Sequence, residues 1–487
     1  MSATGQAPFV TDEPPPLNKA PPTMGKFDPT IPDFMRLGSV PVNYIQEIET
    51  DLLESVVFQE GSGDSVTGFA RFQLQQKGFL HSKSKVFLSL VPPADVSRAM
   101  YPVGVGVGNL VEKAVLKCGN VVINEISSWD GLQAFHSTRI SNENNVEREL
   151  YTTGRCMNHA FRYDIADAGT SNDATHYGLE VGRDITDDGT TSQFLQMPFA
   201  TMDGGSPEQS PSYSIDIGDL FPFMKTTQLP LYIMAMPLTI ELTFRPPKTH
   251  RAVRLGGTED QEFLIDRNEL KFCADYVYYG ATDEMERYAE KNKQMTFSFV
   301  DYRAVSTSVT QASLQSDTVR NLGMANREVS KVLTVFNADR KNEGDLLQGL
   351  GALSTTRNAS HIVGGFSYNL RYNDKFEFSS NITNTARLYS LLQDSQVMVH
   401  ITRDEYSRQG VGYGATAKFE GLDAKAQLSG NFFLNSTRLT GGRVGVRGIE
   451  LHIKATDMRG AVSTMRNWCE YHRVASLTDG QFSVFNA

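Results

Sequence analysis

The chain has 487 residues, of which 40% are hydrophobic, and a formal net charge of −10 at pH 7. A single hydrophobic core stops growing well below this length, so at least two domains are expected, each near the roughly 200–250 residues of large all-β domains. An acidic chain lacks the basic footprint of nucleic-acid-binding proteins, which argues against direct binding of a genome.

Four cysteines are spread along the chain, at Cys118, Cys156, Cys273 and Cys469. None belongs to a C-x-x-C pair, so neither a metal cluster nor a disulfide framework is expected. We expect four reduced, buried thiols in a protein made in a reducing compartment. The sequence shows no basic and apolar secretory signal at its start, and no apolar run of the roughly 18 residues that cross a bilayer.

Residues 1–33 differ in composition from the rest of the chain. They contain eight prolines and few large apolar side chains, so they cannot bury enough surface to offset their ordering entropy. We expect an extended or disordered arm. Its only basic residues are Lys19 and Lys26, which does not suit a nucleic-acid arm. Two interpretations stay open: a solvated tail, or an arm that orders on a neighbour or an inner layer.

From about residue 40 the pattern becomes that of strands. Residues 65–78 alternate apolar and polar positions after a glycine-rich turn, and residues 110–126 predict two strands around a tight turn at residues 118–120. Residues 141–193 are polar and too long for an ordinary connection, which predicts a large surface excursion.

Three blocks close the first half: Asp219–Phe223, Gln228–Ile233 and Pro237–Phe244. The last block alternates regularly, which predicts a half-buried strand. Pro246 and Pro247 end that strand, because proline cannot continue a ladder. We therefore expect a domain of residues 34–250 followed by a domain of residues 251–487.

The strand pattern restarts in the second half. Residues 270–279 predict a strand, residues 283–290 a short helix with Asp283 as its N-cap, and residues 387–392 another short helix. Further strands are expected near residues 295–300, 330–336, 364–370, 375–379, 395–402, 415–419 and 445–454. Many short strands without a β-α-β alternation favour an all-β protein of two sandwiches with Greek-key connections.

Two of these blocks resemble the double jelly-roll major capsid proteins of double-stranded DNA viruses: nucleocytoplasmic large DNA viruses, virophages and polinton-like viruses. Leu220–Phe223, followed by Leu229–Leu231 and the strand Leu238–Phe244, resembles a segment late in the first jelly roll. Ala274–Tyr278 with Glu286–Ala289 looks like the opening of the second jelly roll. Outside these blocks the resemblance is architectural, and the run 232–237 departs from the giant-virus pattern towards a polinton-like or virophage-like relative.

The resemblance implies a fold of two tandem eight-stranded jelly rolls with a few short helices and long loops. It implies a homotrimer, pseudo-hexagonal because it holds six jelly rolls, that tiles an icosahedral shell with neighbouring capsomers. Penton proteins, minor capsid proteins and an internal membrane are further candidate partners. The expected location is the virion capsid, after synthesis in the host cytoplasm or nucleus. No enzymatic activity and no cofactor are implied.

Candidate chemical sites are weak. The glycine-rich run Tyr101–Asn109 lacks the GK[ST] ending of a phosphate loop and is expected to be a turn or strand edge. The acids Asp184, Asp187 and Asp188 lack calcium-loop spacing. No paired-histidine ligand motif and no G-x-S-x-G elbow occurs, and His452 and His472 are expected to be ordinary surface or core residues. The sequence therefore assigns no catalytic, cofactor-binding or metal-binding residue.

Two other functions compete with the capsid interpretation. A two-domain β-sandwich carbohydrate-active enzyme or sugar-binding protein would need paired carboxylates or stacked aromatics, and only Trp129 and Trp468 are tryptophans. A receptor-binding fibre would show sequence repeats, and none is seen. The sequons at Asn358, Asn381 and Asn435 are expected to be chance matches.

Overall fold

The computed structural model describes residues 46–91, 98–137, 212–225, 228–247, 262–279, 293–338, 366–383, 434–455 and 458–486, apart from gaps of up to three residues, and short pieces between these ranges. The expected arm of residues 1–33 lies outside the described residues. So do the strands expected near 395–402 and 415–419, and most of the excursion 141–193. Of the helices expected at 283–290 and 387–392, only isolated residues are described.

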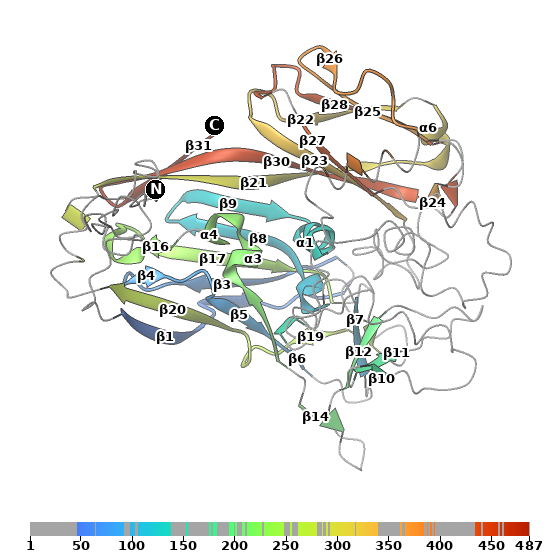
Figure 1. The fold of residues 1–487 in the computed structure, drawn as a ribbon. Coiled ribbons are helices and arrows are strands. Elements are labelled where there is room, and N and C mark those ends of the chain that lie inside the picture. Colours follow the sequence, from blue (N-terminus) through green and yellow to red (C-terminus); the bar gives the residue numbers. More distant parts are fainter. Residues whose placement is uncertain are drawn as a thin grey trace, which may run out of the picture.

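Four sheets form the body of the molecule (Figure 1). The first sheet has the order β15-β5-β20-β4-β16, with β1 on the other side of β20. Its strands are β1 (Gln46–Glu54), β4 (Phe79–Leu80), β5 (Lys85–Leu88), β15 (Tyr213–Asp216), β16 (Leu229–Pro230) and β20 (Lys271–Tyr279). The second sheet has the order β2-β3-β17-β8-β9. Its strands are β2 (Val57–Gln59), β3 (Gly68–Gln73), β8 (Val111–Cys118), β9 (Val121–Ser127) and β17 (Leu238–Phe244).

The third sheet has the order β21-β30-β23-β27, with β31 also on β30. Its strands are β21 (Gln294–Ser308), β23 (Val329–Ala338), β27 (Leu434–Arg438), β30 (Val462–Thr478) and β31 (Gln481–Asn486). The fourth sheet has the order β22 (Thr318–Gly323), β28 (Ile449–Ala455), β25 (Phe366–Tyr372) and β26 (Lys375–Phe376).

Smaller elements complete the described chain. A five-stranded sheet contains β10 (Thr175–His176), β11 (Leu179–Gly182), β12 (Phe194–Pro198), β7 (Arg98–Pro102) and β18 (Arg254–Leu255). Three strand pairs are β13 (Ala200–Thr201) with β14 (Pro207–Gln209), β19 (Leu264–Ile265) with β6 (Leu90–Val91), and β24 (His361–Ile362) with β29 (Met458–Arg459). The helices are η2 (Gly106–Leu110), α1 (Trp129–Ser137), α3 (Ile217–Leu220), α4 (Pro222–Lys225), η4 (Leu231–Ile233) and α6 (Gln311–Gln315).

Strand β17 shows how the sequence pattern becomes core. Its four apolar residues are at most 1% exposed and point into one cluster, which confirms the strand predicted from the alternation: Leu238, Ile240, Leu242 and Phe244. The strand lies between β3 and β8, antiparallel to both. Pro246 and Pro247 follow directly after it, where no ladder has to continue.

Strand β20 belongs to the first sandwich, although the sequence resemblance makes it the opening of the second. It pairs with β1 over its full length and with β4 and β5 on its other side. Phe272, Ala274 and Tyr276 are buried in the same cluster as β17. Alternation identifies the strand but not its partners, because pairing depends on distant segments. The boundary between residues 250 and 251 remains a proposal, and these pairings favour moving it to follow Tyr279.

The third sheet is shared by two hydrophobic clusters. Strands β21 and β30 pair over 15 residues without a register shift. At one end, Phe297 and Leu477 lie in the cluster formed with the first two sheets. At the other end, Met465 and Cys469 lie in the cluster formed with the fourth sheet. Figure 1 shows the two strands running across β9 and on beneath the fourth sheet. We call the two clusters with their sheets the first and second modules.

Buried polar side chains tie the shared sheet to the first module. Asp301 on β21, only 1% exposed, accepts hydrogen bonds from Asn124 of β9 at 2.6 Å and from Tyr471 and Arg473 of β30 at 3.0 and 2.8 Å. Burial raises the pKa of Asp301, and the Arg473 guanidinium opposes that rise. The three donors come from two sheets, so the carboxylate fixes how the sheets pack.

A second link joins helix α1 to β30. Asp130 is fully buried and pairs with Arg245, which follows β17, while Arg466 of β30 lies 3.8 Å away. At the neighbouring Gly131, a Cβ atom would lie 2.9 Å from the Trp468 ring. Glycine is therefore required there for the indole to pack against the helix.

The described cysteines are free. Cys118 and Cys469 are buried and Cys273 is half-buried, whereas Cys156 lies outside the described residues. Burial raises the pKa of Cys118 to about 11 and that of Cys469 to about 12. Both groups are therefore almost wholly protonated, unreactive thiols at neutral pH.

We expect Phe297→Ala to lower the free energy of unfolding by about 3–5 kcal/mol, because the ring fills the first core at the shared sheet. Phe297 is 3% exposed and its ring lies 5.7 Å from that of Phe223. Phe485→Ala is the matched control, since that ring is 57% exposed, and a change below about 0.5 kcal/mol is expected. Urea titration of both variants measures the difference, and equal midpoints would contradict the shared core.

Alkylation tests the thiols. In the native protein at pH 8, iodoacetamide should leave Cys118 and Cys469 unmodified, because burial both blocks access and suppresses the thiolate. Both should react fully in urea. Peptide mass spectrometry reads each site separately, and equal alkylation of Cys469 with and without urea would refute its burial.

Candidate functional site

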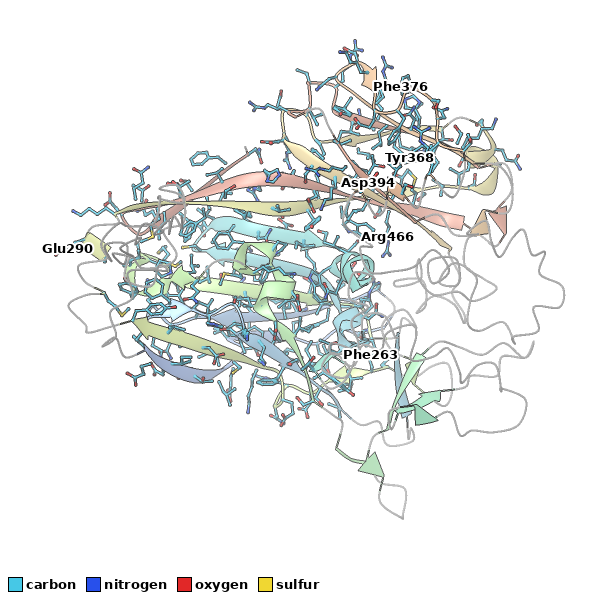
Figure 2. All side chains as sticks on the ribbon, viewed as in Figure 1. Phe263, Glu290, Tyr368, Phe376, Asp394 and Arg466 are labelled. Carbon is cyan, nitrogen blue, oxygen red and sulfur yellow. The ribbon has the colours of Figure 1, made fainter. Side chains whose placement is uncertain are left out.

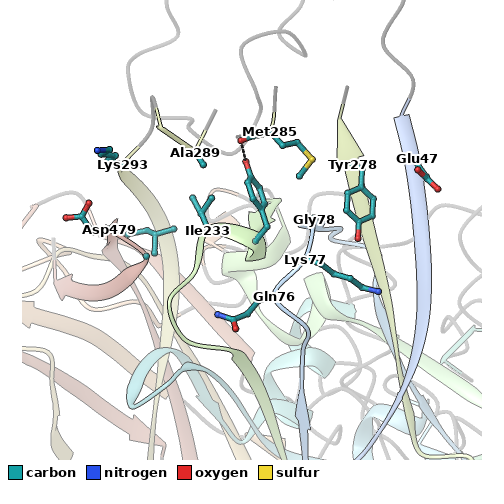
Figure 3. Close-up of a pocket in the computed structure, with 13 residues that line it drawn as sticks. Glu47, Gln76, Lys77, Gly78, Ile233, Tyr278, Met285, Ala289, Lys293 and Asp479 are labelled. Carbon is teal, nitrogen blue, oxygen red and sulfur yellow. Dashed lines mark hydrogen bonds between the residues drawn. The ribbon is translucent and has the colours of Figure 1, made fainter. Parts of the chain in front are cut away.

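A cavity of about 740 Å³ lies at the end of the first module (Figure 3). Its walls come from β1, β20 and the turn before β4 on one side, and from the β30–β31 turn on the other. The lining residues are Glu47, Gln76, Lys77, Gly78, Tyr232, Ile233, Tyr278, Met285, Ala289, Lys293, Leu477, Asp479 and Gly480.

The charge of Lys77 in this cavity is already neutralised. Its ammonium lies 2.6 Å from Glu49 and 2.7 Å from Asp51, both on β1, and 4.7 Å from the centre of the Tyr276 ring. Desolvation lowers the pKa of Lys77, but the bonds to Asp51 and Glu49 outweigh it and hold the pKa above its ordinary value. Tyr278 donates to Glu49 at 2.7 Å. The network therefore fixes β1 on the module rather than presenting Lys77 to an anionic ligand.

The carboxylates of the cavity do not suit a glycosidase. Its two carboxylates, Glu47 and Asp479, are both exposed, whereas a glycosidase acid needs a shielded carboxyl group. Trp129 and Trp468, the only tryptophans of the chain, are 2% and 1% exposed. Both indoles are therefore core residues, and neither can stack on a carbohydrate.

The other candidate residues that the structure describes lie on different elements. The glycine-rich run Tyr101–Asn109 is divided between the end of β7 and the start of η2, where Val107 and Asn109 are fully buried. His452 lies on β28, with its ring 5.1 Å from that of Phe376, and His472 lies on β30. The acids Asp184, Asp187 and Asp188 lie outside the described residues.

The structure describes two of the three sequon asparagines, Asn381 and Asn435. The side-chain amide of Asn381 is engaged, since it donates to Ser367 and accepts from Asn369, both at 2.9 Å. Asn435 lies on β27 and Asn358 outside the described residues. Within the described ranges, no cluster of three metal-ligating side chains occurs and no helix is long and apolar enough to cross a membrane.

The first module has an open flank, formed by β1, Ser55, Val56 and β2, that sequence patterns did not single out. Among the described strands, β1 pairs only with β20 and β2 only with β3, so each is an edge strand of its sheet within the described residues. Four large apolar side chains on this flank are 41–63% exposed: Ile48, Leu52, Val56 and Val57. The period-two run of acids at 47, 49 and 51 was the available signal for β1.

Comparison with known proteins gives fold matches. No family model matches the sequence, and no curated protein does. The crystal structure of PBCV-1 VP54, fitted into a cryo-EM reconstruction of the virophage Sputnik, matches with a TM-score of 0.53 at 9% identity, over 92% of this chain and 98% of that one. The PBCV-1 virus capsid gives a TM-score of 0.52 at 10% identity over the same shares. The Faustovirus major capsid protein gives 0.51 at 6% identity, over 88% and 90%.

At identities this low the likeness lies in the arrangement of the backbone. It extends over both modules, and the matched chains are covered almost completely. The resemblance and the all-β class inferred from sequence are thereby confirmed. The chain has the double jelly-roll fold of viral major capsid proteins.

Proposed function

We propose that this chain is a major capsid protein, a structural component of the virion shell. The main observation in support is that the two modules share one sheet, which contains the paired strands β21 and β30. A continuous pair of strands holds two sandwiches in one fixed arrangement, which a shell subunit needs if its contacts are to repeat identically. The backbone likeness to capsid proteins over about nine-tenths of the chain supports the same function.

The capsomer we propose is a homotrimer. Three copies bring six sandwiches together, and six similar lobes give the pseudo-hexagonal outline that packs as a tile in an icosahedral shell. Closed symmetry is the common solution for repeated contacts between identical chains. Obligate interfaces of this kind bury roughly 2,000 Å² or more, which the broad sides of two sandwiches can supply.

Neighbouring capsomers are the further partners that we propose, together with penton proteins, minor capsid proteins and an internal membrane. The protein resides in the virion after synthesis in the host cytoplasm or nucleus. We propose no enzymatic role and no direct contact with nucleic acid. The exposed carboxylates of the cavity and the buried indoles support this proposal over a carbohydrate-active protein.

Light scattering on a sizing column tests the oligomer. The expected mass is three times the 54.0 kDa of the chain, and negative-stain images of the peak should show a three- or six-sided outline. A monomer at every concentration would contradict the trimeric capsomer and favour the alternative of a carbohydrate-active or sugar-binding protein. A panel of polysaccharides, screened on the same sample, would then examine the carbohydrate alternative.

Removal of residues 1–33 tests the arm. We expect the truncated chain to trimerise normally, because the proline-rich segment precedes both modules, and to assemble closed shells poorly. Sizing measures the first property and electron microscopy of assembly reactions the second. Loss of the soluble trimer would show that the arm acts within the capsomer instead.

A further inference from the structure

The two sheets of the second module come close to each other at their edge strands β21 and β22. Among the described strands, β21 pairs only with β30 and β22 only with β28. Helix α6 lies between the two strands in the chain. At Gly323, the last residue of β22, an added Cβ atom would lie 3.9 Å from Nη1 of Arg303 on β21. The end of β22 therefore lies beside the Arg303 side chain.

Arg303 and Arg327 lie on the same face of the shared sheet, on either side of β30. Arg303 pairs with Cys469 in the ladder of β21 and β30. The guanidinium of Arg327 lies 4.7 Å from the centre of the Tyr471 ring, and Tyr471 has the same facing as Cys469, two residues away. Burial raises the pKa of Cys469, and the charges of both arginines oppose that rise. Both guanidinium groups therefore lie near one sulfur atom.

Arg320 on β22 points towards the same face of the shared sheet. The residues two positions before and after it, Thr318 and Leu322, are buried, so this face of β22 is the inner one. Figure 2 labels Tyr368 on the inner side of the fourth sheet and Phe376 on its outer side. The Nε atom of Arg320 is buried and has no hydrogen-bond partner among the described residues. A buried donor of this kind is costly until an acceptor reaches it.

Arg443 joins these arginines from a second loop. Its Nε donates to the carbonyl oxygen of Asn326 at 3.0 Å. The backbone of Val444 donates to Arg327 at 2.8 Å and accepts from Asn326 at 2.9 Å. The loop is thereby fixed on the turn Gly323–Arg327, which connects β22 to β23. We call Arg303, Arg320, Arg327 and Arg443 the arginine cluster.

The turn inside the cluster has an unusual backbone. Gly323, Met324 and Asn326 have φ angles of +72°, +67° and +59°. Left-handed backbone is uncommon for side chains such as methionine, and here burial of Met324 to 1% exposure holds it in place. Strained backbone of this kind gathers at ligand sites, because the surrounding structure must over-determine it.

The charge of the cluster is not balanced by nearby acids. None of its four arginines forms an ion pair with a described residue. Asp301, beside Tyr471, is already bound to Arg473 at 2.8 Å. Glu328, next to Arg327 in the chain, is exposed and likewise forms no ion pair with a described residue. Even with Glu328 counted, the cluster has a local excess of positive charge, although the chain has a net charge of −10.

The chemistry of the cluster favours a phosphate group as its ligand. The planar guanidinium group matches the oxygens of carboxylates and phosphates in pairs. A carboxylate has a single charge, whereas a phosphate group has a charge of about −1.5 to −2 at pH 7 and three strong acceptor oxygens. Several arginines with unmatched charge therefore suit phosphate better than a lone carboxylate.

We propose that the arginine cluster binds a phosphate group, either as a free anion or as the headgroup of a lipid. Arg303 and Arg327 bind its oxygens from the two sides of β30. Arg320 contributes its unpaired Nε, and Arg443 the outer charge. The site lies within one chain, so its test does not depend on the proposed trimer.

Calorimetric titration of the full chain with inorganic phosphate tests the site, with sodium chloride of equal ionic strength as the reference. We expect saturable binding. Arg303→Gln with Arg327→Gln should raise the dissociation constant at least about tenfold, because two charge-assisted contacts are lost. A purely structural role for Arg327, as cover for the Tyr471 ring, would lower stability without changing phosphate binding. Should the double variant unfold, Arg303→Gln alone decides, since that side chain is exposed.

A matched pair of variants separates the site from net charge. Arg267 and Arg438 are exposed arginines elsewhere, before β20 and on the opposite edge strand β27. Arg267→Gln with Arg438→Gln removes the same charge and should leave phosphate binding unchanged. Wild-type protein that does not bind phosphate, or equal losses in both pairs of variants, would overturn the proposal.

Vesicles distinguish the two sources of the phosphate group. The chain is sedimented with vesicles of phosphatidylcholine alone and with added phosphatidic acid. Sedimentation only with phosphatidic acid, lost in Arg303→Gln with Arg327→Gln and reduced by free phosphate, assigns the site to a lipid headgroup. Binding of free phosphate without sedimentation assigns it to a small anion. Sedimentation that persists in that double variant would contradict a lipid site at the cluster.

Discussion

The ladder between β21 and β30 is the interaction on which the rest of the structure depends. It pairs 15 residues in one register, and its two ends lie in two different cores. A slip of one residue would turn each side chain to the opposite face of the sheet. Phe297 at one end and Met465 at the other must both be buried. The pairing register of β21 and β30 is therefore specified independently by each of the two cores. The relative placement of the modules follows from that register.

Polar side chains buried at the junction refine this placement. Asp301 receives donors from β9 and β30, and Asp130 pairs with Arg245 close to Trp468. Buried ion pairs add little net stability, because desolvation offsets their attraction, yet removing one partner is costly. Their effect is therefore on geometry: other packings of the same sheets would leave these charges without partners.

Sequence patterns predicted where strands lie in the chain better than they predicted which strands pair in a sheet. The alternation of β17 and the prolines behind it were sufficient to place that strand, because both signals are local. The position of β20 in the first sandwich depends on β1, β4 and β5, which lie about 200 residues earlier, and no local pattern encodes it. The open flank was missed for a similar reason. An exposed Leu52 has the same sequence pattern as a buried one, and only the assembled sheet reveals which strand has no second neighbour among the described residues.

The shared sheet also determines when the protein can become stable during its synthesis. The first core includes Phe72 and Leu116 from early in the chain, but also Ala475, Leu477 and Phe482. A ribosome must therefore release nearly the entire chain before the first module can close. Until then the apolar faces of its two sheets remain accessible, which makes the incomplete chain prone to aggregation. Chains with such distant contacts fold slowly, so a host chaperone has a long interval in which to bind. Truncated products lack the final strands and cannot complete the first core.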